Sequence, residues 1–223
     1  LLDSGSLHLN VQVHRLARDS LNPQRWQVHA EGDSPAVWSG FDAVLLAMPH
    51  VQAQQLLRQS SAMVVGHSLL DAMDPVRVAP CWTLMLAYPQ ASQPSLAHLG
   101  PQWNAARSTH HRVAWLARES SKPGRLRVER WTVQASAAWS EEHLEDDPLR
   151  VQAKLTKAFA ELTGIRAEPS HAEVHRWRFA KTMVPLGQAY LWDATHNLGT
   201  CGDWHLGHRV EDAFVSGLSL ALA

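Results

Sequence analysis

The amino-acid sequence predicts a mixed fold of the α/β (α+β) class, in which a discontinuous first domain receives an inserted second domain. Runs of alternating apolar and polar residues, typical of half-buried strands, recur along the chain, and segments with helical spacing separate them. We expect the first domain to comprise 1–75 and 190–223, and a mostly antiparallel sheet with helices to occupy 76–189. A chain of 223 residues is long enough for this arrangement.

Two strand patterns lie near the start of the chain. Leu7, Leu9, Val11 and Val13 alternate with polar residues, and a second run begins at Trp26 after a turn-forming segment. This pattern predicts a short antiparallel strand pair.

A largely apolar run follows from Phe41 to Pro49. Such runs are typical of strands that are buried on both faces of a parallel sheet. Pro49 ends the predicted strand, and the helix formers from His50 to Leu57 predict a helix directly after it.

The middle of the chain contains longer alternating runs. They predict strands of a second sheet at Trp82–Tyr88, Arg112–Ala117 and Leu126–Val133. Two helices interrupt this region. Ser140 is the expected N-cap of the first, and Asp147 before Pro148 is the expected start of the second. The second helix should end at Gly164 and bury the apolar residues at helical spacing, which are Val151, Leu155, Ala158, Phe159 and Leu162.

The last segment predicts a strand from Leu198 to Asp203, a turn containing Gly207, and a helix. Gly217 is expected to allow a close approach between this helix and its neighbour. The apolar residues expected on one face of the helix are Val210, Ala213, Phe214, Gly217, Leu218 and Ala221. In a strand–turn–helix unit of this kind, the helix N-terminus can face a ligand.

Composition limits the classes of partner. Hydrophobic residues make up 45% and charged residues 18%, and the formal net charge is −1, so neither nucleic acid nor an anionic membrane is an expected partner. The two cysteines, Cys81 and Cys201, are typical of free thiols in a reducing compartment, which predicts a cytoplasmic protein. The start at Leu1 lacks an initiator Met and a signal peptide, which suggests a piece of a longer chain. We expect a small-molecule substrate, while the sequence leaves the oligomeric state open.

Asp203 stands at the end of the last predicted strand, directly before the helix. Its carboxylate can accept hydrogen bonds from ligand hydroxyls, and the helix N-terminus carries about half a positive charge toward an electron-rich group. An ordinary capping aspartate is the alternative, because this arrangement occurs in many α/β proteins.

The amino-acid motif of this segment favours a cofactor site. Gly202-Asp203-Trp204, followed by Val210-Glu211-Asp212-Ala213-Phe214 and Ser216-Gly217, resembles the C-terminal FAD motif of renalase-like flavoproteins, a group within the flavin amine oxidase superfamily. Phe41–Pro49, Trp115–Arg125 and His175–Ala180 are similar to further segments of that family. The resemblance implies a partial FAD/NAD(P)-binding Rossmann-like domain with an inserted substrate domain.

The resemblance also implies roles for residues. Gly202 and Asp203 would contact FAD at its ribityl region, the backbone near Arg209 and Val210 would meet the pyrimidine edge of the flavin, and the backbone of Val13 would hold the adenine. A helix N-terminus near the flavin pyrimidine favours electron acceptance.

The implied activity is the oxidation of dihydronicotinamide isomers by an FAD-dependent oxidoreductase, with oxygen reoxidising the flavin. Ten tryptophans could provide planar walls for such a substrate, and arginines could bind its phosphate or carboxamide. The candidate pocket residues are Trp115, Arg118, His175, Trp177, Arg178 and Trp192, with Lys122 as a further cation. For each of them, an ordinary core or surface role is the alternative.

Two other outcomes remain open at the level of sequence. A flavin-dependent amine oxidase shares the Gly-Asp region, although only two tyrosines are present for an aromatic cage. The sequence has no G-x-G-x-x-G for the pyrophosphate, so a non-catalytic, truncated fragment that cannot hold FAD is another alternative. Metal and acyl-transfer sites are not expected, because neither the histidine spacing nor a G-x-S-x-G motif supports them.

Overall fold

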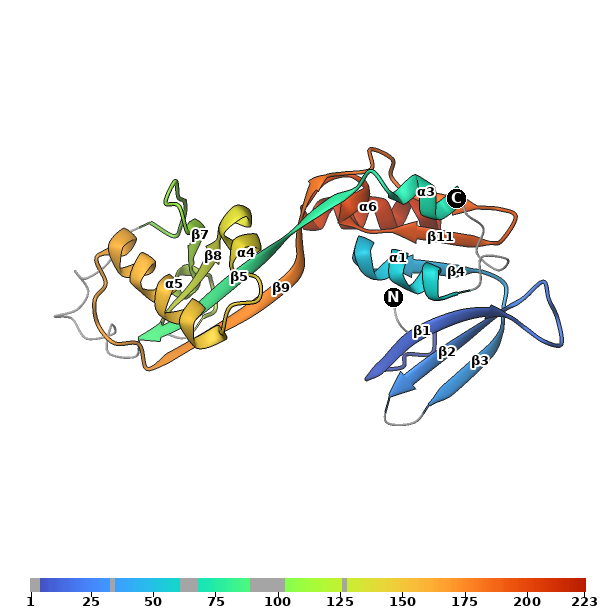
Figure 1. Ribbon diagram of the computed structural model, residues 1–223, viewed down its shortest axis with the longest axis horizontal. Helices are drawn as coiled ribbons and strands as arrows, with labels where there is room; N and C mark the ends of the chain where they lie inside the picture. The colour runs from blue at the N-terminus through green and yellow to red at the C-terminus, as the bar shows by residue number, and fades with distance from the viewer. Residues whose placement is uncertain (1–4, 33–34, 61–67, 89–102, 126–127) are drawn as a thin grey trace. The chain divides into compact units, whose positions relative to one another are not determined.

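The computed structural model describes residues 5–32, 35–60, 68–88, 103–125 and 128–223. It confirms the predicted mixed α+β class. The chain divides into unit 1, which comprises Leu1–Val78 and Thr182–Ala223, and unit 2, which comprises Ala79–Lys181 (Figure 1). The inserted domain expected at 76–189 therefore extends a few residues beyond unit 2 at both ends.

Unit 1 begins with an antiparallel sheet of β1 (Val11–Arg18), β2 (Trp26–Gly32) and β3 (Ala36–Phe41). The antiparallel pairing of β1 with β2 confirms the predicted strand pair. However, the first strand starts only at Val11, and Leu7 and Leu9 are exposed outside it. The strand β3 completes the sheet and was not predicted.

The second sheet of unit 1 has the order β10-β11-β4, with β4 at Val44–Ala47, β10 at Leu191–Asp193 and β11 at Leu198–Cys201. The pair β11 and β4 is parallel, whereas β10 and β11 are antiparallel. All of β11 is buried, but Leu45 in β4 is 51% exposed. The prediction that β4 is buried on both faces is therefore wrong for the described residues.

Within the described residues of unit 1, three helices accompany these sheets: α1 (His50–Gln59), α3 (Ser68–Met73) and α6 (Val210–Ala221). Pro49 caps the start of α1, as the sequence predicts for a helix that begins after this proline. A short 3-10 turn, η4 (Asp203–His205), lies between β11 and α6. The last strand thus ends at Cys201, two residues before the predicted end at Asp203.

The buried face of α6 is not the predicted one. Ser216 and Leu220 are buried, whereas Val210, Phe214 and Leu218 are 89%, 68% and 48% exposed. The close approach occurs at Gly199 of β11, where a Cβ would lie 2.9 Å from the Leu220 side chain, and a Cβ at residue 217 would meet nothing within 4 Å. The apolar spacing therefore predicted a helix correctly and its packed face incorrectly.

Unit 2 contains a five-stranded sheet of order β6-β7-β8-β5-β9. Its strands are β5 (Arg77–Tyr88), β6 (Ala105–Arg107), β7 (Val113–Arg118), β8 (Glu129–Ala135) and β9 (His171–Val184). The predicted strands coincide with most of β5, β7 and β8, although residues 126 and 127 lie outside the described residues. The strand β8 pairs with both β5 and β7, and β6 pairs with β7; all three pairings are antiparallel, as expected.

The helices of unit 2 are α4 (Ala137–Glu142) and α5 (Pro148–Thr163), and a 3-10 turn, η3 (Glu119–Ser121), follows β7. The start of α5 is confirmed, because the Asp147 carboxylate accepts hydrogen bonds from two backbone N–H groups, and Gly164 ends it at φ 78°. Leu162 is 36% exposed, so the predicted buried face is one residue too long.

The predicted N-cap of α4 is wrong. Ser136 caps this helix, while Ser140 lies inside it and its hydroxyl accepts a hydrogen bond from the backbone N–H of Trp82. The apolar faces of α4 and α5 pack on one face of the sheet and form the core of unit 2 (Figure 1). Among the described helices, none is long and apolar enough to cross a membrane.

Candidate functional site

The candidate cofactor site lies at the carboxyl ends of the parallel strands β4 and β11. The register pairs Ala47 with Cys201, so both strands end side by side. After β4 the chain turns at Met48 into α1, and after β11 it turns at Gly202 into η4. The carboxyl edge of parallel strands is the usual place for ligands in open α/β sheets.

The Gly202 turn is held by contacts with both flanking segments. The backbone N–H of Gly202 donates to the Ser216 hydroxyl of α6 at 3.0 Å, and the indole Nε1 of Trp204 donates to the Met48 carbonyl at 3.0 Å. A Cβ at residue 202 would lie 2.6 Å from that indole nitrogen, so only glycine fits beneath the ring. The three-residue motif is therefore one packed unit.

The buried side chain of His205 also holds the Gly202 turn in place, through hydrogen bonds of both ring nitrogens. It is fully buried, its Nδ1 lies 3.0 Å from the Gln188 carbonyl, and its Nε2 lies 3.1 Å from the Thr200 hydroxyl. Because the carbonyl can only accept, Nδ1 carries the proton and Nε2 accepts from Thr200. Burial lowers the pKa of His205 to about 4, so the ring is neutral near pH 7.

Asp203 presents its carboxylate at this turn. Its Oδ1 accepts a hydrogen bond from the backbone N–H of Trp204 at 2.9 Å, which fixes the carboxyl plane. No described residue makes a hydrogen bond to Oδ2, and the residue is partly exposed. This oxygen can accept hydrogen bonds from hydroxyls of a ligand.

The helix α6 begins five residues after the end of η4. Arg209 occupies the N-cap position, and the Asp212 carboxylate accepts hydrogen bonds from the backbone N–H groups of His208 and Arg209. The helix leaves the N–H groups of Val210 and Glu211 without acceptors of its own. These groups and the helix dipole suit an electron-rich partner, although Asp212 offsets part of the positive field.

Val13 lies elsewhere in unit 1. It belongs to β1, pairs with Ala30 of β2, and packs partly against the core of the unit. The strand β1 stands at the edge of its sheet, and an edge strand has backbone groups that are not used in the ladder. The backbone of Val13 can therefore contact a ligand, while its side chain serves packing.

Three predicted pocket residues share one face of the unit 2 sheet. In β7, Leu116 faces the core while Trp115 points to the other face; in β9, Val174 packs against the core while His175 and Trp177 point away from it. The rings of His175 and Trp177 lie 4.2 Å apart, and Trp177 is 52% exposed. We call this surface, with Trp115, His175 and Trp177, the open face.

A cavity of about 470 Å³ lies along part of the open face. Its apolar wall includes Trp115, and its polar wall includes Glu119, Thr132 and Gln134. Sequence reasoning missed these last three. For Thr132 and Gln134 the sequence does contain a signal: they alternate with buried residues of β8, which places them on the same face as Trp115.

Arg118 and Lys122 line the same cavity as Trp115. Arg118 and Arg178 each form an ion pair with a glutamate. Nε and Nη2 of Arg118 donate to both carboxylate oxygens of Glu129 at 2.7 and 2.9 Å, and this hydrogen bonding raises the pKa of Arg118. The two terminal nitrogens of Arg178 donate to Glu145, which likewise raises its pKa. Both arginines thus serve ion pairs, and Lys122 pairs with Glu119.

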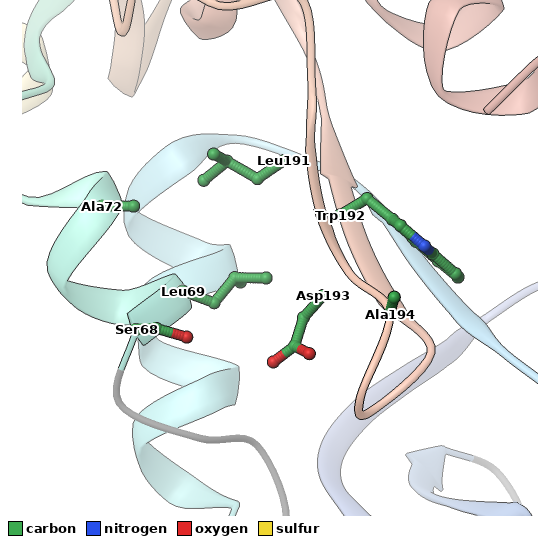
Figure 2. Close-up of a pocket in the computed structure, with 7 residues that line it drawn as sticks. All are labelled: Ser68, Leu69, Ala72, Leu191, Trp192, Asp193 and Ala194. Atoms are coloured by element: carbon green, nitrogen blue, oxygen red, sulfur yellow. The ribbon is translucent and has the colours of Figure 1, made fainter.

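Trp192 borders a different cavity of about 250 Å³ in unit 1, which is lined by α3 and by residues 191–194. Figure 2 shows that the Trp192 ring points away from α3, whereas the Asp193 carboxylate points toward the Ser68 side. The ring packs at Gly199 instead. The structure therefore brings Trp192 together with β11, and places it in a different unit from Trp115, His175 and Trp177.

The described residues contain no group of three or more His, Cys, Asp or Glu side chains that could hold a metal ion. Cys201 is buried and burial raises its pKa, and burial likewise raises the pKa of Cys81. Both thiols are therefore protonated near pH 7, so neither is an activated nucleophile.

No protein-family model matches the sequence. Among solved structures, the chain is similar to cyclohexylamine oxidase from Brevibacterium oxydans IH-35A, with a TM-score of 0.67, 14% identity, and coverage of 95% of this chain and 47% of that one. It is also similar to a proposed protoporphyrinogen oxidase from Exiguobacterium sp. 255-15, with a TM-score of 0.63 and the same identity and coverage. The chain spans about half the length of the structures it matches, and it shares its fold with that half of two oxidases.

Proposed function

We propose that this chain is part of an FAD-dependent oxidoreductase that transfers a hydride from a planar, dihydronicotinamide-type substrate to flavin. The observation that carries the proposal is the Gly202 turn, where a carboxylate and a helix N-terminus follow the carboxyl end of a parallel strand. The fold match to FAD-dependent oxidases supports it, because the match covers 95% of the chain.

The residues at the turn fit part of FAD. The Oδ2 atom of Asp203 would accept hydrogen bonds from ribityl hydroxyls, and the N–H groups at the start of α6 would face the electron-rich pyrimidine edge. The edge strand β1 would offer its backbone at Val13 to the adenine. The sequence has no G-x-G-x-x-G turn for the pyrophosphate, so these residues account for only part of the cofactor contacts.

The open face of unit 2 would bind the substrate. Trp115, His175 and Trp177 offer planar surfaces, and Gln134 in the adjoining cavity can exchange hydrogen bonds with a carboxamide. FAD, when bound, would supply the redox chemistry: the two electrons and one proton of the substrate hydride, with one further proton from solvent, would reduce oxygen to hydrogen peroxide.

Flavin binding tests the proposal directly. Because the chain spans half the length of the matched structures, the experiment uses the complete product of the gene beside this chain alone. We expect the complete protein to be purified yellow, and Asp203→Asn to weaken FAD binding by about tenfold, since a neutral amide is a weaker acceptor than a carboxylate. If the complete protein stays colourless with added FAD, the proposal is wrong. A yellow complete protein beside a colourless chain would show that the chain alone is a fragment that cannot hold FAD.

A flavin-dependent amine oxidase is the second candidate, because cyclohexylamine oxidase is among the matched structures. Anaerobic mixing of the yellow protein with dihydronicotinamide isomers or with simple amines separates the two candidates. Bleaching of the flavin by the dihydronicotinamide isomers supports the first proposal, and bleaching by amines alone supports the second. Trp177→Ala should raise the KM for the accepted substrate, because it removes the exposed ring of the open face.

A further inference from the structure

We infer that Trp204 is a positioning residue for flavin binding, because it joins the two turns that leave the carboxyl ends of β4 and β11. This inference rests on the function proposed above. Trp204 is 1% exposed, so it acts on a ligand through the residues that it holds.

The indole nitrogen makes the connection. Its N–H donates to the Met48 carbonyl at 3.0 Å, and Met48 lies between β4 and the first turn of α1. The ring also meets His50 edge-on, with the centroids 5.2 Å apart. One buried side chain from the second turn therefore fixes the backbone of the first.

The same residue fixes Asp203 by its backbone. The N–H of Trp204 donates to Oδ1 of Asp203 at 2.9 Å, and the Trp204 carbonyl accepts a hydrogen bond from the N–H of Leu186 at 3.0 Å. Gly202 passes under the ring, where a Cβ would clash. A shift of the indole would therefore move the backbone on both sides of Asp203 and turn its carboxylate.

The test is Trp204→Phe in the complete gene product, which keeps an aromatic ring and removes the N–H donor. We expect FAD binding to weaken by about tenfold, which corresponds to the loss of one buried hydrogen bond and the misplacement of the carboxylate. Trp26→Phe is the matched control, because Trp26 is fully buried in unit 1 and its Nε1 donates to the His196 carbonyl at 2.9 Å, away from the Gly202 turn. This control should lower thermal stability and leave FAD affinity within about twofold.

A double-mutant cycle distinguishes positioning from general destabilisation. If Trp204 acts through Asp203, then Asp203→Asn combined with Trp204→Phe should bind FAD about as tightly as the weaker single variant, whereas independent effects would multiply. Affinities are measured well below each unfolding transition. Unchanged FAD affinity in Trp204→Phe, or multiplicative losses in the cycle, would overturn the inference while the wild type still binds flavin. A wild type without flavin affinity would overturn both this inference and the proposed function.

Discussion

At the scale of single residues, His205 is the group in this fold with the clearest consequence for pH. It is fully buried beneath the Gly202 turn, and its pKa is about 4 compared with 6.5 for an ordinary histidine. The unfolded chain therefore binds a proton at a pH where the folded chain does not. The free energy of unfolding should fall as the pH drops from 6.5 to about 4, by at most about 3 kcal/mol, and this contribution should be constant outside that window.

The measurement is the midpoint of thermal unfolding between pH 7.5 and 4. His205→Gln removes the titrating group and keeps a polar side chain, so we expect a lower midpoint at pH 7.5 and a shallower fall toward pH 4 than in the wild type. Burial also lowers the pKa of His50, which is present in both proteins and accounts for part of the remaining slope. Equal slopes for wild type and variant would contradict the assignment of the pH dependence to His205.

At the scale of secondary structure, Asp147 is a local sequence signal for the start of α5. The Asp147 carboxylate accepts hydrogen bonds from the N–H groups of Leu149 and Arg150 at 2.9 and 3.2 Å. Asp147→Ala should destabilise unit 2 by about 1 kcal/mol, and Asp147→Asn, which retains an acceptor, by a few tenths. Urea unfolding followed by circular dichroism checks both values, and an alanine variant as stable as the asparagine variant would contradict the capping role.

Local signals predicted some elements well, and the comparison of α5 with α6 shows why others failed. The α5 helix carries its cap, its stop and its buried stripe within its own residues, and each acts at short range. The α6 stripe of Val210, Phe214 and Leu218 is equally periodic but exposed, because periodicity identifies an apolar face without identifying what covers it. Ser216 was not predicted as a contact, since only β11 and its turn give its hydroxyl a partner.

The same distinction applies to the site. The Gly202 turn could be located from the sequence, because strand, glycine, acid and helix are adjacent. Arg118 and Arg178 could not be assigned, because their partners Glu129 and Glu145 lie 11 and 33 positions away along the chain. The contact between Trp204 and Met48 joins residues 156 positions apart, so no local sequence pattern predicts it.

At the scale of the whole molecule, the two units have separate hydrophobic cores. The buried residues in the core of unit 2 lie between Trp82 and Ile165 in the sequence. Those in the core of unit 1 lie between Leu16 and Val76, and Leu198 and Trp204 are added to them. No residue is common to both clusters. Because the described residues of each core come from a single unit, we expect each core to form without the apolar side chains of the other unit.

We therefore expect the segment 76–184 to fold when it is expressed alone, with β5 and β9 at its ends paired in one sheet. Circular dichroism should show native-like secondary structure, and urea should unfold it in one cooperative transition. The control segment 89–184 lacks β5 and with it Trp82, Leu84, Leu86 and Tyr88, which supply one strand of the core, so it should fail to fold. A segment 76–184 that binds hydrophobic dyes and unfolds without a transition would show that unit 2 depends on unit 1, and that two separate cores do not make two independent folding units.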